Sequence, residues 1–479
     1  MALAIGIATL LLLYRAEGFG IDRQGEVTQS GLVFVSSNPT NATVYLNDER
    51  YRSSTNTRLA PNAGPYTVKI VKDGYRPWER PIWVAGGDVQ RLTYPLLIPQ
   101  NLQTASLADL DSDPTLTTGS PNKRWVLLGR QQAGVFTQYD LKNPDKPTAT
   151  ELTLPTDSFN PGSGPQTWVA VEWAIDNRHV LLQHSYKSGN DTLREYIVLD
   201  RDTPANSVNL TNTLKLTQTQ TVSLFNNGTD SYYVYDIAAL TLRRVDGTTA
   251  EAQSTIEHVL AYKTYGEHEI LYVSDRSAAG KTTNGQVNVI LQDGEHALTL
   301  RTLPPAGNGT YVLNLATYNG DWYVAAASTS DSAAYIYQNP QDQQLKDGEY
   351  PAPWRRVQVG GVSFLSFSSN SQFLLAENGQ QFAVYDLENI AQYHYTTSQP
   401  IDAPQQHAVW LDSHRIAYVS GAKLLMFDYD YRNAQTLVPA NAAYTAFLAS
   451  DYSYLYAVQP VGADTKAAFT ATPLTVKKD

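Results

Sequence analysis

One pattern recurs along the chain from residue 100 to residue 479. A strand-like segment meets a turn rich in Asn, Asp, Gly or Ser. A strongly apolar segment, a hairpin and a segment that often ends in Asp then follow. The clearest copy is "VSFLSFSSNSQFLLAENGQQFAVYDLEN", residues 362–389, in which Asn378-Gly379 is a strong hairpin signal. Repetition of one unit that cannot bury its own apolar face predicts a repeat architecture.

The spacing of the copies narrows this architecture. The second strands are expected to begin near Trp125, Val180, Tyr232, Ile270, Tyr323, Phe373, Ile416 and Leu455. Four short strands with their turns need about 40–45 residues, the period of a propeller blade, and the shortest intervals leave no room for helices. We therefore predict an all-β chain with a β-propeller of about eight four-stranded blades over residues 100–479. Seven blades are the alternative, because the register of the third copy is ambiguous.

Two motifs add a resemblance to this pattern. The "SPNKRWVLL" and "VYDL" segments resemble blades of TolB-like and WD-repeat propellers, although the Gly-His and Trp-Asp signatures of WD repeats are absent. The last copy offers only three strands, and propellers usually close by pairing both chain ends in one blade. Residues 100–107 are expected to supply the missing strand. Two smaller propellers or a long β-sandwich array are the alternative folds, and no linker in the body supports a split.

Residues 31–99 have a different pattern, in which short strands surround the turns Asn38-Pro39 and Gly86-Gly87 and the corner "KDGY". The pieces "GLVFVSSNPTNATVYLND" and "LAPNAGPYTVKIVKDGY" resemble the PEGA domain, a small β module found mostly on bacterial and archaeal surface proteins. The resemblance implies a small β-sandwich, although the family's Pro-Glu-Gly-Ala stands here as Pro39-Thr40-Asn41-Ala42. Gly74 is expected to adopt a positive φ. Tyr75 and Trp78 are expected to pack in the core or at an edge.

The first residues predict a membrane-directed segment. Residues 2–14, "ALAIGIATLLLLY", carry no charge, but a bilayer span needs about 20 residues. The segment lacks a basic n-region and a clear cleavage site. We expect residues 1–30 to be a truncated transmembrane helix with a linker, which anchors an otherwise extracellular chain. A cleaved signal and a buried core helix are the alternatives, and the predicted division is 1–30, 31–99 and 100–479.

Charge and cysteine content limit the possible partners and chemistry. The chain has no Cys, which excludes disulfides, thiolate metal sites and Cys nucleophiles. Residues 31–99 carry 8 Lys/Arg and 5 Asp/Glu, whereas residues 100–479 carry 25 Lys/Arg and 38 Asp/Glu. An acidic body argues against nucleic acid. The membrane, a cell-wall polymer, a glycan or another surface protein are the expected partners.

No group of residues predicts catalysis. The histidines nearest in sequence, His179 with His184 and His407 with His414, have no carboxylate at zinc-ligand spacing. The "DLDSDP" segment, residues 109–114, has the alternating acids of a calcium loop but not its Gly or Glu, and is interpreted as a solvated connector. Glu172 is expected to line the propeller channel without a second acid. We therefore predict no catalytic, metal-binding or cofactor-binding residues and no cofactor.

Function is inferred from this architecture alone. The primary hypothesis is a membrane-anchored, non-catalytic surface protein that binds protein or glycan through the propeller, with the PEGA-like module as a spacer or wall-facing domain. The longest breaks in the blade pattern, residues 154–166 and 337–354, are expected to contribute binding residues. The alternatives are an exported polysaccharide lyase or hydrolase and a periplasmic TolB-like trafficking protein. Acids, or a His/Arg/Tyr cluster, converging at a channel mouth would favour an enzyme.

Overall fold

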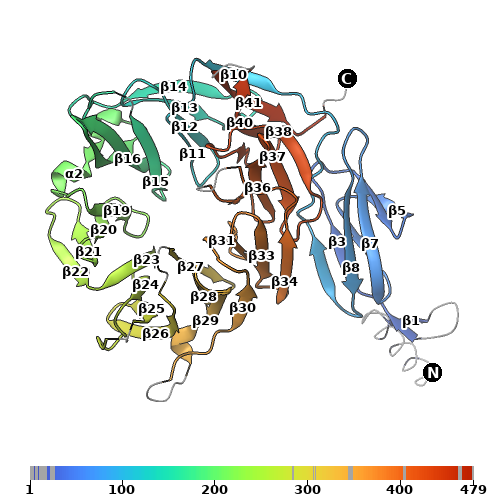
Figure 1. Cartoon of the computed structure of the whole chain (residues 1–479). Helices are drawn as coiled ribbons and strands as arrows, with labels where there is room; N and C mark the ends of the chain where they lie inside the picture. The colour runs from blue at the N-terminus through green and yellow to red at the C-terminus, as the bar shows by residue number, and fades with distance from the viewer. Residues whose placement is uncertain are drawn as a thin grey trace.

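The computed structural model describes residues 5, 9, 14, 19–21, 27–164, 166–282, 285–305, 307, 309–343, 349–402, 406–461 and 466–476. Eight four-stranded sheets lie around a ring, and a smaller two-sheet module lies at its rim (Figure 1). The all-β propeller prediction is confirmed. The helical elements of the described ring are short: η1 (Pro204–Asn206), α2 (Leu210–Thr213) and η2 (Pro340–Asp342).

The eight sheets are numbered here as blades 1 to 8, and their strands are given from the centre outwards. Blade 1 consists of β11 (Leu116–Gly119), β12 (Trp125–Gly129), β13 (Val135–Asp140) and β14 (Thr148–Thr153). Blade 2 consists of β15 (Thr167–Trp173), β16 (His179–Ser188), β17 (Asp191–Asp200) and β18 (Val208–Asn209). Blade 3 consists of β19 (Gln220–Leu224), β20 (Ser231–Asp236), β21 (Thr241–Asp246) and β22 (Ala252–Ile256). Blade 4 consists of β23 (Val259–Tyr265), β24 (Glu269–Ser274), β25 (Val287–Asp293) and β26 (His296–Leu303).

Blade 5 consists of β27 (Tyr311–Tyr318), β28 (Asp321–Ser328), β29 (Ala333–Gln338) and β30 (Arg355–Gln358). Blade 6 consists of β31 (Phe364–Phe367), β32 (Phe373–Glu377), β33 (Gln381–Asp386) and β34 (Ala391–Thr396). Blade 7 consists of β35 (Val409–Trp410), β36 (Arg415–Ser420), β37 (Lys423–Asp428) and β38 (Gln435–Pro439). Blade 8 consists of β39 (Phe447–Leu448), β40 (Tyr454–Val461), β41 (Lys466–Pro473) and β10 (Ala105–Leu110).

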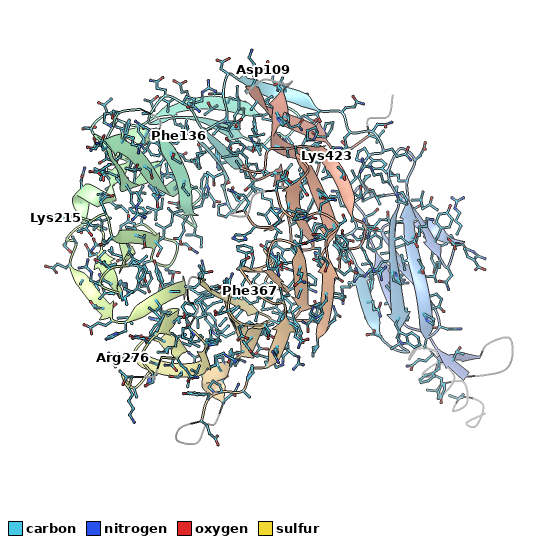
Figure 2. All side chains as sticks on the ribbon, in the orientation of Figure 1. Asp109, Phe136, Lys215, Arg276, Phe367 and Lys423 are labelled. Carbon is cyan, nitrogen blue, oxygen red and sulfur yellow. The ribbon has the colours of Figure 1, made fainter. Side chains whose placement is uncertain are left out.

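The second strand of every blade begins within two residues of its predicted start. These strands are buried on both faces, since each blade packs against two neighbours, and β32 and β36 are buried along their whole length. The outer strands are mostly exposed, as β14 is. Figure 2 shows Phe367 on the inner side of the ring and Lys215 at its outer edge.

Blade 8 joins the two ends of the propeller. β10 pairs antiparallel with β41, so the strand nearest the start of the ring closes the last sheet. The predicted closure is confirmed, although the strand starts at Ala105 rather than at Gln100. The connector interpretation of "DLDSDP" is wrong for its first two residues, because Asp109 and Leu110 pair with Ala468 and Ala467 inside this sheet.

The module has two sheets. One contains β5 (Glu49–Ser54), β4 (Thr43–Leu46), β7 (Gly64–Val71) and β8 (Trp78–Val84), and the other contains β6 (Thr57–Leu59), β3 (Leu32–Val35) and β9 (Val89–Leu92). Tyr75 and Trp78 are buried in the core between them, and Gly74 has a φ of +78°, as predicted. A further pair, β1 (Phe19–Ile21) with β2 (Val27–Gln29), precedes the module.

The N-terminal helix predicted over residues 2–14 lies almost entirely outside the described residues. In the part of the chain that is described, the structure has no helix of the length and hydrophobicity that crossing a membrane requires.

The module is fixed to blade 7 along the free edge of β8. Trp78 Nε1 donates to Asp428 Oδ2 at 2.8 Å, and Arg80 pairs with Asp430 at 3.1 Å. The side-chain amide of Asn433 accepts from Glu79 N–H and donates to Glu79 C=O, as a neighbouring strand would. These contacts attach the module to blade 7 and satisfy the backbone N–H and C=O groups of Glu79 at the edge of β8.

Candidate binding crevice between the module and the ring

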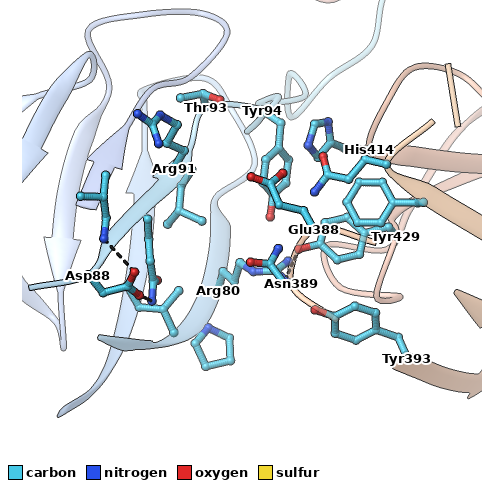
Figure 3. Close-up of a pocket in the computed structure, with 17 residues that line it drawn as sticks. Arg80, Asp88, Arg91, Thr93, Tyr94, Glu388, Asn389, Tyr393, His414 and Tyr429 are labelled. Atoms are coloured by element: carbon cyan, nitrogen blue, oxygen red, sulfur yellow. Dashed lines mark hydrogen bonds between the residues drawn. The ribbon is translucent and has the colours of Figure 1, made fainter. Parts of the chain in front are cut away.

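A crevice of about 440 Å³ lies where β8 and β9 face blades 6 and 7 (Figure 3). Its module wall comes from β8, β9 and the segment that leaves β9. Its ring wall comes from the turns that follow β31, β33, β35 and β37, from the start of β32 and from β34. The residues on which its chemistry depends are Arg80, Tyr94, Glu388, Asn389, Tyr393, His414 and Tyr429. The volume is within the range of small-ligand sites.

An aromatic layer holds the two walls together. The ring of Tyr94 stacks on His414 with centroids 4.3 Å apart, and Arg415 Nη1 donates to the Tyr94 carbonyl oxygen at 2.7 Å. Tyr429 lies edge-on to Tyr393 with centroids 5.3 Å apart. Aromatic side chains from both domains therefore form a continuous surface in the crevice.

The base of the crevice is charged but compensated. Arg80 is 8% exposed, donates to Tyr429 Oη at 2.5 Å and pairs with Asp430. Burial raises the pKa of both Tyr94 and Tyr429, so their hydroxyl groups are neutral at physiological pH. Burial lowers the pKa of His414 to about 4, so its ring is neutral as well. This base offers polar groups without a free charge.

The mouth of the crevice is formed by the turn between β33 and β34. Asp386 accepts hydrogen bonds from the backbone N–H groups of Glu388 and Asn389, which fixes the turn. Glu388 accepts from Tyr318 Oη at 2.7 Å, and Asn389 donates to Asp386 at 2.8 Å. Carboxylate and amide groups held in this way can bind hydroxyl groups of a ligand that lies against the tyrosines.

The channel site predicted from Glu172 has a different character. Glu172 lies on the inner strand β15 and accepts from Leu224 N at 2.7 Å. It shares a pocket of about 460 Å³ with Lys263 and Trp173. Burial raises the pKa of Glu172. No second carboxylate is among the described residues that line this pocket.

The four singled-out histidines lie at separate places. His179 contacts Asp176, with Nδ1 and Oδ2 2.6 Å apart, and His407 contacts Glu377 across 2.8 Å. His184 is buried between Glu195 and Gln166, at 2.8 Å from each. Among the described residues no group of three or more His, Cys, Asp or Glu could hold a metal ion. Asp109, Asp111 and Asp113 form no such group either.

The two long loops differ in packing and in place. In residues 154–166, Phe159 is 8% exposed and packs in the core between blades 1 and 2. In residues 337–354, Trp354 packs against Tyr323 and Tyr385, whereas Tyr350 is 51% exposed. The first loop joins an outer strand to the next blade, and the second joins a third strand to a fourth. In alternating antiparallel blades these connections lie on opposite faces of the ring.

Apart from His414, which was singled out only for its nearness to His407, the sequence motifs did not single out the crevice residues. Tyr393 and Tyr429 belong to the repeat pattern as ordinary aromatic positions. The turn that holds Glu388 and Asn389 was visible as "VYDLEN", yet only the docking of the module makes it one wall of a crevice. The sequence did contain one indication of this site. In "FDYDYRN", residues 427–433, the Asp that ends the third strand of blade 7 is followed by two tyrosines, a second Asp and an Asn.

Comparison with known proteins supports the module by sequence and gives distant structural likenesses over 68–85% of the chain. A PEGA domain family model matches residues 30–98. No curated protein matches the chain. Among solved structures, dihydro-heme d1 dehydrogenase NirN in complex with DHE is 14% identical, with a TM-score of 0.41, and the match covers 85% of this chain and 75% of that one.

Two further structures are similar at the same level. Kluyveromyces lactis Hsv2 is 10% identical with a TM-score of 0.39, over 68% of this chain and 98% of that one. The β-propeller domain of Myceliophteria thermophila Cps50 (Swd1) is 9% identical with a TM-score of 0.38, over 78% of this chain and 100% of that one. The chain thus joins a PEGA domain to a β-propeller built from eight four-stranded sheets.

Proposed function

We propose that this chain is a membrane-anchored, extracellular, non-catalytic surface protein that binds its partner in the crevice between the PEGA domain and the propeller. The observation that carries the proposal is the crevice itself, which both domains line and which the Trp78–Asp428 and Arg80–Asp430 contacts hold in shape. A preformed site loses little entropy on binding. The PEGA domain then acts as a wall of the site as well as a spacer.

The lining favours a glycan. Tyrosine rings and neutral hydroxyl groups lie beside fixed amide and carboxylate groups, and the buried Arg80 is paired with Asp430. A hydroxyl-rich, uncharged ligand can stack on the tyrosine rings and form hydrogen bonds with the amide and carboxylate groups at the mouth without bringing a charge of its own into the crevice. A protein segment is the other partner class, and the same experiment distinguishes the two.

Replacing Tyr393 with alanine should weaken glycan binding about tenfold, since a lost aromatic contact costs about 1 kcal/mol beyond its area. Purified full chain would be tested on an array of neutral oligosaccharides, with binders quantified by calorimetry. Tyr350→Ala is the matched control, because Tyr350 is exposed on the 337–354 loop. Equal losses in both variants would contradict binding in the crevice, and capture of surface proteins but no oligosaccharide would contradict the glycan assignment.

An exported polysaccharide lyase or hydrolase is the second candidate, and Glu172 is the observation that favours it. A half-buried carboxyl on the inner strand β15, whose pKa is raised and which shares a pocket with Lys263, has the character of a general acid. If the chain is an enzyme of this kind, Glu172→Gln should lower polysaccharide turnover at least a hundredfold. We expect no turnover by the unmodified chain. Turnover that Glu172→Gln abolishes would replace the non-catalytic proposal.

A further inference from the structure

The end of the PEGA domain at which β8 turns into β9 exposes apolar side chains on both outer faces. Trp83, near the end of β8, is 67% exposed, and Val89, at the start of β9, is 45% exposed. Val89 lies opposite the half-buried Leu32 in the parallel pair of β3 and β9. Exposed apolar groups concentrated at one end of a small domain mark a contact surface.

The next row of side chains on the β6-β3-β9 sheet is basic and aromatic. Phe34 has Arg58 opposite it on β6 and Arg91 opposite it on β9. Both arginines are exposed, and Arg91 Cζ lies 5.6 Å from the Phe34 ring centroid. Within the described residues neither arginine forms an ion pair with a carboxylate. Their charges are therefore available to an anionic partner at the edge of the crevice, which Val89 and Arg91 also line.

The chain enters the domain at this same end. Gly87 N–H, in the turn between β8 and β9, donates to Ser30 C=O at 3.0 Å. Ser30 directly follows β2, which pairs with β1, and Figure 1 shows β1 beyond this end of the domain. The uncharged segment of residues 2–14 precedes β1 in the sequence. β1 and β2, which follow that segment in the sequence, therefore lie at the same end of the domain as the apolar row.

We propose that this end of the PEGA domain rests on an anionic lipid surface, with Trp83 and Val89 among the headgroups and Arg58 and Arg91 on lipid phosphates. The proposal rests on the proposed membrane anchoring. Tryptophan favours the membrane–water interface, and the guanidinium fork matches phosphate oxygens. The positions of the two rows fit this arrangement. Trp83 and Val89 lie at the end of the domain, where they would reach deepest, and Arg91 lies two residues further along β9, at the level of the phosphates.

The uneven charge of the chain supports the same orientation. Residues 31–99 carry 8 Lys/Arg against 5 Asp/Glu, whereas residues 100–479 carry 25 against 38. An anionic surface attracts the first and repels the second within about a Debye length. The rigid docking on blade 7 would then hold the crevice and the ring in a fixed orientation above the membrane.

The test is depth-dependent tryptophan quenching of the full chain, reconstituted in phosphatidylcholine vesicles with and without phosphatidylglycerol and containing brominated lipid. Quenching should be strongest with phosphatidylglycerol, and Trp83→Phe should remove most of it. Trp322→Phe is the matched control, because Trp322 packs on Tyr265 within the ring. The double variant Arg58→Gln/Arg91→Gln should lose the phosphatidylglycerol dependence. Arg50→Gln/Arg52→Gln, on β5, should retain it.

The outcomes separate this inference from the anchor on which it rests. Flotation of the full chain with vesicles of phosphatidylcholine alone reports the anchor, whatever Trp83 does. If the chain floats while Trp83 emission is unquenched in phosphatidylglycerol vesicles, the inference is overturned and the anchor stands. The inference is also overturned if Arg50→Gln/Arg52→Gln reduces quenching as much as Arg58→Gln/Arg91→Gln. Quenching that depends on Arg58 and Arg91 without flotation in phosphatidylcholine supports the inference and removes the anchor.

Discussion

Replacing Trp78 with alanine is expected to lower the free energy of unfolding by about 3–5 kcal/mol, the usual cost of removing a buried tryptophan. Trp78 is 1% exposed and packs in the core of the PEGA domain. Its indole N–H donates to Asp428 across the domain boundary, and its ring meets Tyr94 edge-on at 5.8 Å. The variant therefore leaves a cavity in one domain and removes the hydrogen bond from Trp78 to Asp428 in the other, where the bond from Asn433 remains. Urea denaturation of the full chain measures the loss.

Trp83→Ala is the control for this prediction, because Trp83 lies on the same strand and is 67% exposed. Its effect should stay within about 0.5 kcal/mol. Similar losses in the two variants would mean that Trp78 is not the main contact between the domains. The comparison also separates the structural tryptophan of β8 from the one that we assign to the lipid surface.

The blades could be predicted because their signal is local. A second strand is apolar on both faces, so its sequence is a continuous apolar run, as in "FLLAE" of β32 and "RIAYVS" of β36. The polar strand β5, "ERYRSS", was not predicted because its exposed side chains show no alternation. It forms because β4 supplies a partner across a sheet edge, which a reading of local periodicity does not reveal.

The crevice could not be predicted because it depends on contacts between residues far apart in the sequence. In blades 1, 2, 3 and 6 the Asp that ends the third strand accepts backbone N–H groups from its own turn, and these residues are Asp140, Asp200, Asp246 and Asp386. Asp428 occupies the same place in blade 7. There it accepts from Trp78, 350 residues away, and from Asn433. One motif therefore has two roles.

That role makes Asp428 the origin of a pH dependence. Burial raises the pKa of its carboxyl to about 6, from an ordinary value of 3.8. The folded state therefore binds more protons than the unfolded state between these values, and stability falls as the pH rises through this window. The expected loss is about 3 kcal/mol between pH 4 and pH 7. Well below pH 3.8 the carboxyl is protonated in both states and adds no slope.

Asp428→Asn should remove this slope. The asparagine oxygen can still accept from Trp78 and Asn433, and no charge is buried at neutral pH. The difference in unfolding free energy between variant and wild type should therefore shift by about 3 kcal/mol in favour of the variant from pH 4 to pH 7. Urea denaturation at each pH measures this difference, in which the titration of all other groups cancels.

Trp78→Ala tests the cause of that slope, because it opens the Asp428 site to water. Solvation of the carboxylate should return its pKa toward 3.8, so the fall in stability between pH 4 and pH 6 should shrink in this variant. If the slope is unchanged in Trp78→Ala but absent in Asp428→Asn, burial by the PEGA domain is not what raises the pKa. If it is unchanged in both, another group carries the pH dependence. A slope that disappears in both identifies the docked domain as the element that makes the stability of this protein depend on pH.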